Sequence, residues 1–273
     1  MQKILAVIMS VYKNDNVEYV KLAVESILHQ TFKDFDFFIQ FDGLVKEEVE
    51  TYLVGQQDVR IKISRRTENK GLAQSLNELL IFVKNQNYSY IARMDADDIS
   101  ILDRFMKQIT YLENHQEIDM VGGAINEINE VGHDRGKVTR YPCEPNECRA
   151  FFAKRNPVAH PTVMFRRSFF EKVDWEYPTD YNRNEDTRLW HEGYKHGCLI
   201  ANLPDVLLNF RVTDDMFKSR RNGKVFAKSQ LDLRKLIAKD LNFGVMAYVY
   251  AYMTYILMIS PSWILKLAYK VLS

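Results

Sequence analysis

The first hundred residues alternate apolar runs of strand length with stretches that repeat apolar side chains at the helical period. Residues 4–9 form a continuous apolar run, as expected of a strand covered on both faces. The next stretch repeats apolar side chains every three or four residues: Val20, Ala23, Val24, Ile27 and Leu28. Further runs lie at 35–41, 59–64 and 88–94, with a second helical stretch at 72–83. This alternation predicts an α/β fold with a doubly wound, mostly parallel sheet flanked by helices.

Polar clusters follow the predicted strands, at residues 10–15, 42–43, 65–71 and 95–98. In such sheets, ligands bind at the carboxyl ends of the strands, so these clusters predict one shared binding site. The chain has neither a G-x-G-x-x-G motif after its first strand nor a G-x-x-x-x-G-K-[ST] motif. If the site binds a phosphate, the negative charge of that phosphate must therefore be balanced by something other than a glycine-rich phosphate-binding loop.

Charge is unevenly distributed along the 273 residues. The whole chain holds 37 basic and 36 acidic side chains, which does not indicate a nucleic-acid partner. Residues 211–273 alone hold 11 basic and 4 acidic side chains, and no charge lies between Asp240 and Lys266. Three cysteines, Cys143, Cys148 and Cys198, lack the spacing of a zinc site or a disulfide framework, so we expect free thiols.

The D-A-D-D segment after the run at 88–94 places Asp95, Asp97 and Asp98 where a ligand can reach them. Neighbouring carboxylates repel each other unless a cation lies between them, and oxygen ligands favour Mg²⁺ or Mn²⁺. One interpretation is a divalent ion that holds a diphosphate. The alternative is that Asp97 or Asp98 only caps the following helix, for which Ser100 and Asp103 also form a candidate capping box.

Three further groups have both a chemical and a structural interpretation. Glu185 and Asp186 begin a predicted helix, where a carboxylate is either a cap or an exposed base. His160, between prolines, is either a catalyst or a structural group. Arg220 and Arg221 either clamp phosphates with their guanidinium groups or form a solvated surface.

Taken in order, these segments resemble the family-2 glycosyltransferases, which are inverting enzymes of the GT-A fold. The likeness covers about residues 3–225 and rests on S-V-Y-K-N-D at 10–15, E-S-I-L-H-Q-T at 25–31, D-G at 42–43, E-N-K-G-L at 68–72, R-M-D-A-D-D at 93–98 and E-D-x-x-L-W at 185–190. The blocks at 156–166 and 220–223 are most similar to the bacterial exopolysaccharide, capsule and O-antigen branch, which includes the amylovoran-type enzymes.

The resemblance implies roles for particular residues. A nucleotide-sugar donor would contact Ser10, Val11, Tyr12, Asp42, Asn69, Gly71, Arg93, Asp95, Ala96 and Asp97. Mn²⁺ or Mg²⁺ would be held by Asp97 with Asp95, and Asp186 would be the catalytic base, with Glu185 as the alternative. The acceptor or a diphosphate would contact His160, Trp190, Arg220 and Arg221.

Two departures from the family pattern affect this assignment. The paired aspartates common after the second strand are Phe41-Asp42 here, which leaves one carboxylate to recognise the base or the ribose. The Gly-Gly-Tyr sequence that often precedes the E-D pair is replaced by residues 175–178, Trp-Glu-Tyr-Pro, so we expect a differently shaped loop on the acceptor side.

The resemblance implies a metal-dependent enzyme that moves a hexose, from UDP-galactose or UDP-glucose, to a polyprenyl-diphosphate-linked glycan in the synthesis of a bacterial surface polysaccharide. Residues 1–212 would form the catalytic domain, with donor binding in 1–100 and the acceptor side in 101–212. The alternatives are a nucleotidyltransferase that makes a nucleotide sugar and a non-catalytic, membrane-bound protein that binds one.

Residues 213–273 are predicted to be a basic loop and an apolar helical tail. A helix needs roughly 20 apolar residues to cross a bilayer, and residues 241–265 are long enough. Gly244, Pro261 and the many tyrosines nevertheless resemble an interfacial segment, and an apolar stripe of Trp263, Ile264, Leu267, Ala268 and Val271 follows. We expect a peripheral protein on the cytoplasmic face of the inner membrane. Packing on the catalytic domain, packing on a second subunit, and a true span remain as alternatives.

Overall fold

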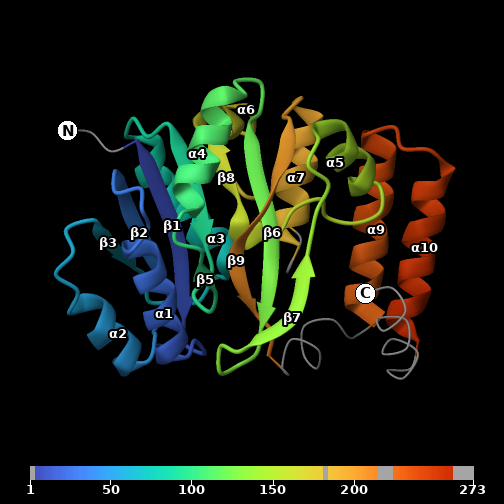
Figure 1. The fold of residues 1–273 in the computed structure, drawn as a ribbon. Helices are drawn as coiled ribbons and strands as arrows, with labels where there is room; N and C mark the ends of the chain where they lie inside the picture. Colours follow the sequence, from blue (N-terminus) through green and yellow to red (C-terminus); the bar gives the residue numbers. More distant parts are fainter. Residues whose placement is uncertain (1–3, 181–183, 214–223, 261–273) are drawn as a thin grey trace.

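The structure is a computed structural model that describes residues 4–180, 184–213 and 224–260. Within these residues a nine-stranded sheet runs in the order β3-β2-β1-β4-β8-β6-β9-β5, and β7 pairs with β6 (Figure 1). Helices cover both faces of this sheet. The predicted α/β class with flanking helices is confirmed.

The first four strands pair with one another in parallel, and their ends are aligned. They are β1 (Leu5–Tyr12), β2 (Phe35–Asp42), β3 (Ile61–Arg65) and β4 (Tyr90–Met94). Tyr12 lies opposite Asp42, and Met9 lies opposite Met94. The loops that follow these strands therefore meet at one edge of the sheet, as the polar clusters in the sequence predict.

The second half of the sheet is mixed. Its strands are β5 (Ile99–Ser100), β6 (Met120–Ile128), β7 (Asp134–Thr139), β8 (Met164–Arg166) and β9 (Ile200–Arg211). The short strand β8 runs antiparallel between β4 and β6, and β9 returns parallel to β6. A 3₁₀ turn, η1 (His160–Thr162), leads into β8, which brings the segment around His160 next to the end of β4.

Two apolar cores lie on opposite faces of the sheet. Helices α1 (Val17–Leu28), α2 (Glu47–Val54) and α4 (Arg104–Asn114) bury their apolar stripes in one core. The other core receives side chains from α3 (Leu72–Lys84), α5 (Pro145–Phe152), α6 (Arg167–Lys172) and α7 (Glu185–Lys195). Amphipathic helices on both faces explain why the strands between them are apolar almost throughout.

Helix α1 has a side-chain cap, whereas α4 lacks the predicted one. The side chain of Asn16 accepts a hydrogen bond of 2.8 Å from the backbone N–H of Glu18 and thereby caps α1. The capping box at Ser100 and Asp103 was wrong, because Ser100 belongs to β5 and pairs with β9. Asp103 precedes α4 without a side-chain cap bond and pairs with Lys107 at 3.1 Å instead.

Helix α9 (Lys224–Asp240) packs into the second core although it follows the predicted boundary at residue 212. Leu233 and Ile237 are fully buried there, together with Leu189 of α7. The guanidinium group of Arg149 donates a 2.9 Å hydrogen bond to the carbonyl oxygen of Leu241, just after α9. The first part of the predicted tail is thus part of the body that carries α7.

Helix α10 (Val245–Ile259) packs against α9 at the side of the molecule (Figure 1). Among the described helices, none is long and apolar enough to cross a membrane. The predicted stripe from Trp263 to Val271 lies outside the described residues. All three cysteines are free thiols, as expected.

We expect Leu233→Ala to lower the free energy of unfolding by about 2–5 kcal/mol, because this side chain is fully buried in the second core. Urea unfolding followed by circular dichroism measures the change. Val225→Ala on the same helix is the control, because Val225 is 87% exposed and its truncation should change stability by less than about 0.5 kcal/mol. Equal stabilities for the two variants would show that α9 does not belong to the folded body.

Candidate active site

The D-A-D-D segment forms an acidic cluster directly after β4. Asp95, Asp97 and Asp98 each offer a carboxylate oxygen, and these atoms all lie within 4.8 Å of one another. The guanidinium group of Arg93, which is buried, donates hydrogen bonds to both oxygens of Asp95, one of them 2.6 Å long. Asp95 therefore has a fixed orientation at the end of its strand.

Asp98 is the buried member of the cluster and was not among the predicted metal ligands. One of its oxygens accepts a 2.8 Å hydrogen bond from the backbone N–H of Arg211, and its other oxygen, Oδ2, is buried without a hydrogen-bond partner in the structure. Burial, together with the charges of Asp97 and Asp95, raises the pKa of Asp98 well above its usual range. Asp98 cannot be the cap of α4, because that helix begins six residues later, at Arg104.

The chemistry of this cluster fits a divalent cation. Three carboxylates within reach of one ion supply the hard oxygen ligands that Mg²⁺ and Mn²⁺ prefer. The buried Oδ2 atom of Asp98 has no hydrogen-bond partner in the structure and so could be a ligand of such an ion. Asp97 and Asp95 would hold such an ion, as expected, and Asp98 is a third candidate that the structure adds.

Asp15, at the end of the loop after β1, is a further acidic group that the sequence-based assignment missed. Its carboxylate accepts a 2.8 Å hydrogen bond from the backbone N–H of Tyr12. Burial, together with the charges of Asp97 and Asp95, raises the pKa of Asp15 to about 7 against the effect of that hydrogen bond. Asp15 could have been predicted from its position in the polar cluster at residues 10–15, which follows a strand as the other acidic clusters do.

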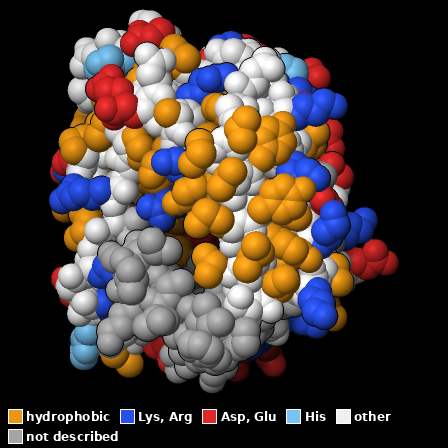
Figure 2. Space-filling view, turned by 90° about the vertical axis from the view of Figure 1, so that its right-hand side faces the viewer, with side chains coloured by type: hydrophobic (Ala, Val, Ile, Leu, Met, Phe, Trp, Pro, Cys, Tyr) orange, Lys and Arg blue, Asp and Glu red, His pale blue; other side chains and the backbone are white. Residues whose placement is uncertain are grey.

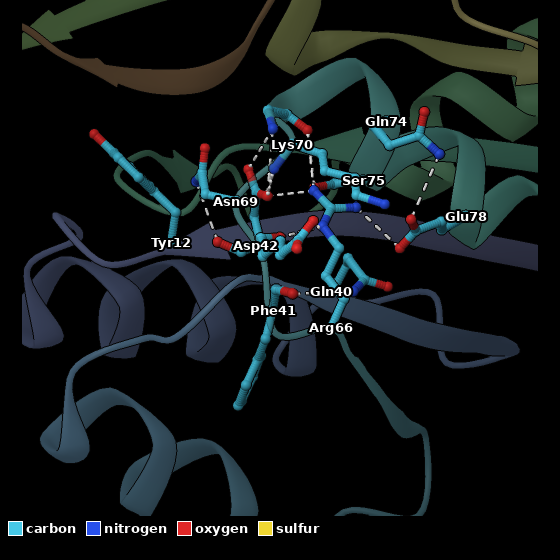
Figure 3. A network of polar contacts seen from close by, with 12 residues as sticks. Tyr12, Gln40, Phe41, Asp42, Arg66, Asn69, Lys70, Gln74, Ser75 and Glu78 are labelled. Atoms are coloured by element: carbon cyan, nitrogen blue, oxygen red, sulfur yellow. Dashed lines mark hydrogen bonds and ion pairs between the residues drawn. The ribbon is translucent and has the colours of Figure 1, made fainter.

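Asp42 is the centre of a second network, at the ends of β2 and β3 (Figure 3). Its carboxylate accepts hydrogen bonds from the backbone N–H groups of Lys70 (2.7 Å) and Gly71 (3.0 Å) and forms an ion pair with Arg66. The side chain of Asn69 donates a 3.1 Å hydrogen bond to the backbone carbonyl of Asp42. Asp42 thus fixes the 66–71 loop from below, and only 4% of its surface is exposed.

Arg66 was also missed, although it lies in a strand-end cluster. Its guanidinium group bridges from Asp42 to Glu78, at 2.9 Å, and to the hydroxyl of Ser75, at 2.8 Å, both on α3. An arginine that joins the end of β2 to α3 holds the loop between them in one shape. No periodic pattern marks such a residue, because its partners lie 12 and 24 positions away in the chain.

Two glycines let this loop approach β2. Gly43 has φ +79°, and a Cβ atom there would lie 2.8 Å from the backbone nitrogen of Asn69. Gly71 has φ +88° and has open space on its Cβ side. The donor-site residues Asn69 and Gly71 therefore line an accessible edge beside Tyr12, which is half-buried and lies opposite Asp42 in register. Ser10 is also half-buried, whereas the side chains of Val11 and Ala96 are buried.

Glu185 and Asp186 begin α7, on the other side of the acidic cluster. Oxygen Oδ2 of Asp186 accepts a 2.9 Å hydrogen bond from the side chain of Asn156, and Oδ1 accepts a 2.6 Å hydrogen bond from the backbone N–H of Thr187. Burial raises the pKa values of both Asp186 and Glu185. A carboxylate with a raised pKa and a fixed orientation suits a general base.

Arg234 of α9 supports this carboxylate through Asn156, and no motif in the sequence marks it. The guanidinium group donates a 3.2 Å hydrogen bond to Oδ1 of Asn156, the same amide whose nitrogen donates to Asp186. A second hydrogen bond, of 3.1 Å, goes to the carbonyl oxygen of Phe152. Burial lowers the pKa of Arg234 to about 10, partly offset by the negative charge of Asp186.

His160 and Trp190 lie beneath the site. His160 is 8% exposed, and its Nε2 atom lies 3.2 Å from the hydroxyl of Tyr177. Burial lowers the pKa of His160 well below its usual range, and the charge of Arg93 adds to this effect, so the ring is neutral. Trp190 is fully buried against His160, with ring centroids 5.6 Å apart. Because Trp190 has no exposed surface in this structure, its predicted contact with an acceptor is not seen here.

The Trp-Glu-Tyr-Pro loop is held firmly on α3. The backbone N–H of Tyr177 donates to Oδ1 of Asn77 at 2.7 Å, and Nδ2 of Asn77 donates back to the carbonyl oxygen of Tyr177 at 2.9 Å. Tyr177 itself is fully buried. Arg220 and Arg221, predicted to contact a diphosphate, lie outside the described residues.

The sequence also matches the model of a known protein family. The family model described as glycosyl transferase family 2 matches residues 6–174, more than half of the chain. The chain belongs to glycosyltransferase family 2. The match includes the acidic cluster and the 66–71 loop, and it ends before Glu185 and Asp186.

Curated relatives agree with this family. An uncharacterized glycosyltransferase of Haemophilus influenzae is 33% identical over 85% of this chain and 84% of its own length. The amylovoran biosynthesis glycosyltransferase AmsE of Erwinia amylovora is 32% identical over 85% and 84%. A UDP-Gal:alpha-D-GlcNAc-diphosphoundecaprenol beta-1,3-galactosyltransferase of Escherichia coli is 26% identical over 83% and 80%.

Solved structures share the fold. TarS 1–349 of S. aureus in complex with UDP has a TM-score of 0.64 and 16% identity, and the match covers 92% of this chain and 69% of that one. The mannosyltransferase PcManGT of Pyrobaculum calidifontis, in complex with GDP-Man and Mn²⁺, has a TM-score of 0.59 and 15% identity, with coverage of 93% and 74%. The expected GT-A fold is thus confirmed.

We expect Asp97→Asn to abolish the Mn²⁺-dependent part of UDP binding, because the amide removes a negative charge from the cluster that holds the ion. Isothermal titration of UDP, with and without Mn²⁺, measures the effect. Asp134→Asn, in the exposed strand β7, is the control and should bind UDP as the wild type does. Unchanged Mn²⁺ dependence in Asp97→Asn would remove this cluster from consideration as a metal site.

We expect Arg234→Met to lower the turnover number about tenfold or more while leaving the UDP affinity unchanged, because the Asn156 amide loses the partner that orients it toward Asp186. The positive charges of Arg234 and Arg93 lower the pKa of Asp186, so removing Arg234 should also shift the acid limb of the rate profile to higher pH. Arg234→Lys should partly restore both. A variant with wild-type turnover and an unshifted profile would reduce Arg234 to a packing role.

Proposed function

We propose that this family-2 enzyme is a metal-dependent inverting transferase that moves a hexose, from UDP-galactose or UDP-glucose, to a glycan carried on a polyprenyl diphosphate. Its product would be a precursor of a bacterial surface polysaccharide. The observation that carries the proposal is that the acidic cluster after β4 lies near two half-buried carboxylates, Glu185 and Asp186, at the start of α7.

The charged groups of the site fall into two sets, the acidic cluster with Arg93 and the carboxylates of α7, which supports a donor side and an acceptor side. The charge of Asp95 contributes to the raised pKa of Glu185, and the charge of Arg93 lowers the pKa values of both Glu185 and Asp186, so the two groups lie within electrostatic reach of each other. The nucleotide would lie on the β1–β4 side, next to Tyr12, Asn69 and Gly71. The acceptor would enter next to α7.

The chain's own residues account for the chemical step. Asp186 accepts the proton of the acceptor hydroxyl as that oxygen attacks the anomeric carbon of the donor, with inversion. The transition state has oxocarbenium character, as in glycoside cleavage. Glu185, with its raised pKa, is the alternative base. A bound divalent ion supplies stabilisation of the negative charge on the leaving diphosphate.

The comparisons support a UDP donor and a lipid-linked acceptor. One relative is named as a UDP-Gal-dependent galactosyltransferase that acts on a diphosphoundecaprenol-linked sugar, and the related fold of TarS is known with UDP and with UDP-GlcNAc. AmsE is named for amylovoran biosynthesis, which supports the polysaccharide role. An acceptor of this kind would place the enzyme on the cytoplasmic face of the inner membrane.

The test of the donor is a screen of UDP- and GDP-linked hexoses for slow hydrolysis by the full chain with Mn²⁺. We expect UDP-linked hexoses to be hydrolysed and GDP-linked ones to be ignored. Hydrolysis of GDP-mannose alone would overturn the UDP assignment. Formation of a nucleotide sugar from a sugar phosphate and a nucleoside triphosphate would instead support the nucleotidyltransferase alternative, and UDP binding without any turnover would support the non-catalytic one.

We expect Asp186→Asn to keep the UDP affinity and lose about 10²- to 10⁴-fold in turnover, because the amide cannot accept the proton. Wild-type turnover should fall on the acid side through a pKa above the usual range of an aspartate, because burial raises the pKa of Asp186 and only the ionised form is a base. Glu185→Gln is the matched control. An inactive Glu185→Gln beside an active Asp186→Asn would assign the base to Glu185.

A further inference from the structure

Helix α10 exposes more than half of its apolar side chains. Only Ala247 and Ala251 are buried, on the side that faces α9. Its 15 residues include no charged side chain. Eight of its large side chains are between 39% and 77% exposed: Val245, Met246, Val249, Tyr250, Tyr252, Met253, Ile256 and Ile259. We call these eight residues the α10 face.

The α10 face is continuous. Val245, Val249, Tyr252, Ile256 and Ile259 recur every three or four residues and so form one stripe along the helix, with the other three beside it. Figure 2, which views this side of the molecule, shows hydrophobic side chains gathered there with lysines and arginines around them. Large exposed apolar patches with a polar rim mark surfaces that bind a protein or a membrane.

Basic side chains form the rim of the α10 face. The Nζ atom of Lys154 lies 5.5 Å from the centre of the Tyr250 ring, and that of Lys235 lies 5.7 Å from the Tyr252 ring. Residues 224–260 hold five basic and two acidic side chains. The acidic ones already have partners, because Asp232 pairs with Lys228 at 2.6 Å and Asp240 lies 3.1 Å from the ring of His191.

We propose that the α10 face lies flat on a bilayer that contains anionic lipid, with its apolar side chains among the acyl chains and Lys154 and Lys235 at the headgroups. The proposal rests on the proposed function, since it would bring the site to a lipid-linked acceptor. Tyrosines suit this position because their rings are apolar and their hydroxyls reach water. One side of α10 is held by α9, so lipid would cover only the other side.

The charge of the rim favours a bilayer over a second copy of this chain. In a two-fold dimer, the same patch would face itself, and the basic rims would be brought together. Basic residues near an anionic bilayer are attracted instead, each by about 1 kcal/mol. On a membrane, the basic rim and the apolar face both favour binding. In a dimer, the apolar face would favour association and the basic rims would oppose it.

The test is co-sedimentation of the full chain with vesicles of phosphatidylethanolamine and phosphatidylglycerol, and with vesicles of phosphatidylcholine alone. We expect binding to the anionic vesicles, and a loss of about a hundredfold in the double variant Met253→Glu/Ile256→Glu, since each apolar contact is worth roughly tenfold. The matched control is Ile81→Glu/Phe82→Glu on α3, whose side chains are 59% and 47% exposed against 53% and 58% for Met253 and Ile256.

A second pair of variants tests the rim. Lys154→Gln/Lys235→Gln should weaken binding to anionic vesicles by roughly fivefold per residue and reduce its dependence on salt. Lys62→Gln/Lys84→Gln, which removes two exposed lysines elsewhere, should bind as the wild type does. Equal binding of the wild type to phosphatidylcholine and to anionic vesicles would overturn the role of the rim.

The outcomes separate this proposal from the proposed function. Vesicle binding is measured without donor or acceptor, and UDP titration of Met253→Glu/Ile256→Glu confirms that the variant is folded. A wild-type chain that stays in the supernatant with anionic vesicles overturns the membrane proposal and leaves glycosyl transfer untouched. Concentration-dependent dimers that Ile256→Glu dissociates, without vesicle binding, would assign the α10 face to a second copy. Vesicle binding by an enzyme without transferase activity would overturn only the proposed function.

Discussion

The buried ion pair between Arg93 and Asp95 is the interaction on which the site depends. Arg93 is the penultimate residue of the buried strand β4, and its guanidinium group holds both oxygens of Asp95. Burial alone would lower the pKa of Arg93, but the charges of Asp95 and Asp98 raise it. The positive charge of Arg93 thus lies close to the acidic cluster, to Glu185 and Asp186, and to the neutral His160. It reduces the repulsion between these neighbouring carboxylates.

Two halves of the chain meet around this charge, and each is held by long-range polar contacts. In the first half, Arg66 and Asp42 tie the ends of β2 and β3 to α3. In the second half, Asn156 connects Asp186 with Arg234. The second connection makes α9 part of the site, although α9 lies in what the sequence presents as a tail. The α10 face is attached to that same helix, so the surface proposed to meet the membrane is one helix away from the base.

The sequence determined the parallel half of the sheet and the place of the site. Continuous apolar runs and helical periods fix β1 to β4 and their helices, because local patterning and burial point the same way there. The strand-end clusters then predicted that Asp42, Asp95 and Asp97 would lie at the same edge of the sheet, and the family resemblance added Asp186. The capping box at Ser100 and Asp103 failed because pairing of β5 with β9 outweighed a local preference for a helix start.

Only the tertiary structure decided which groups surround these residues and which side of α10 is buried. Asp98, Arg66 and Arg234 have partners far away in the chain, and no local spacing encodes such contacts. Trp190 looked like a site residue from its motif, yet the second core buries it completely. Residues 245–259 are apolar nearly all round, so their sequence could not say which side would pack. The answer depends on α9, against which Ala247 and Ala251 are buried while eight large side chains of α10 stay exposed.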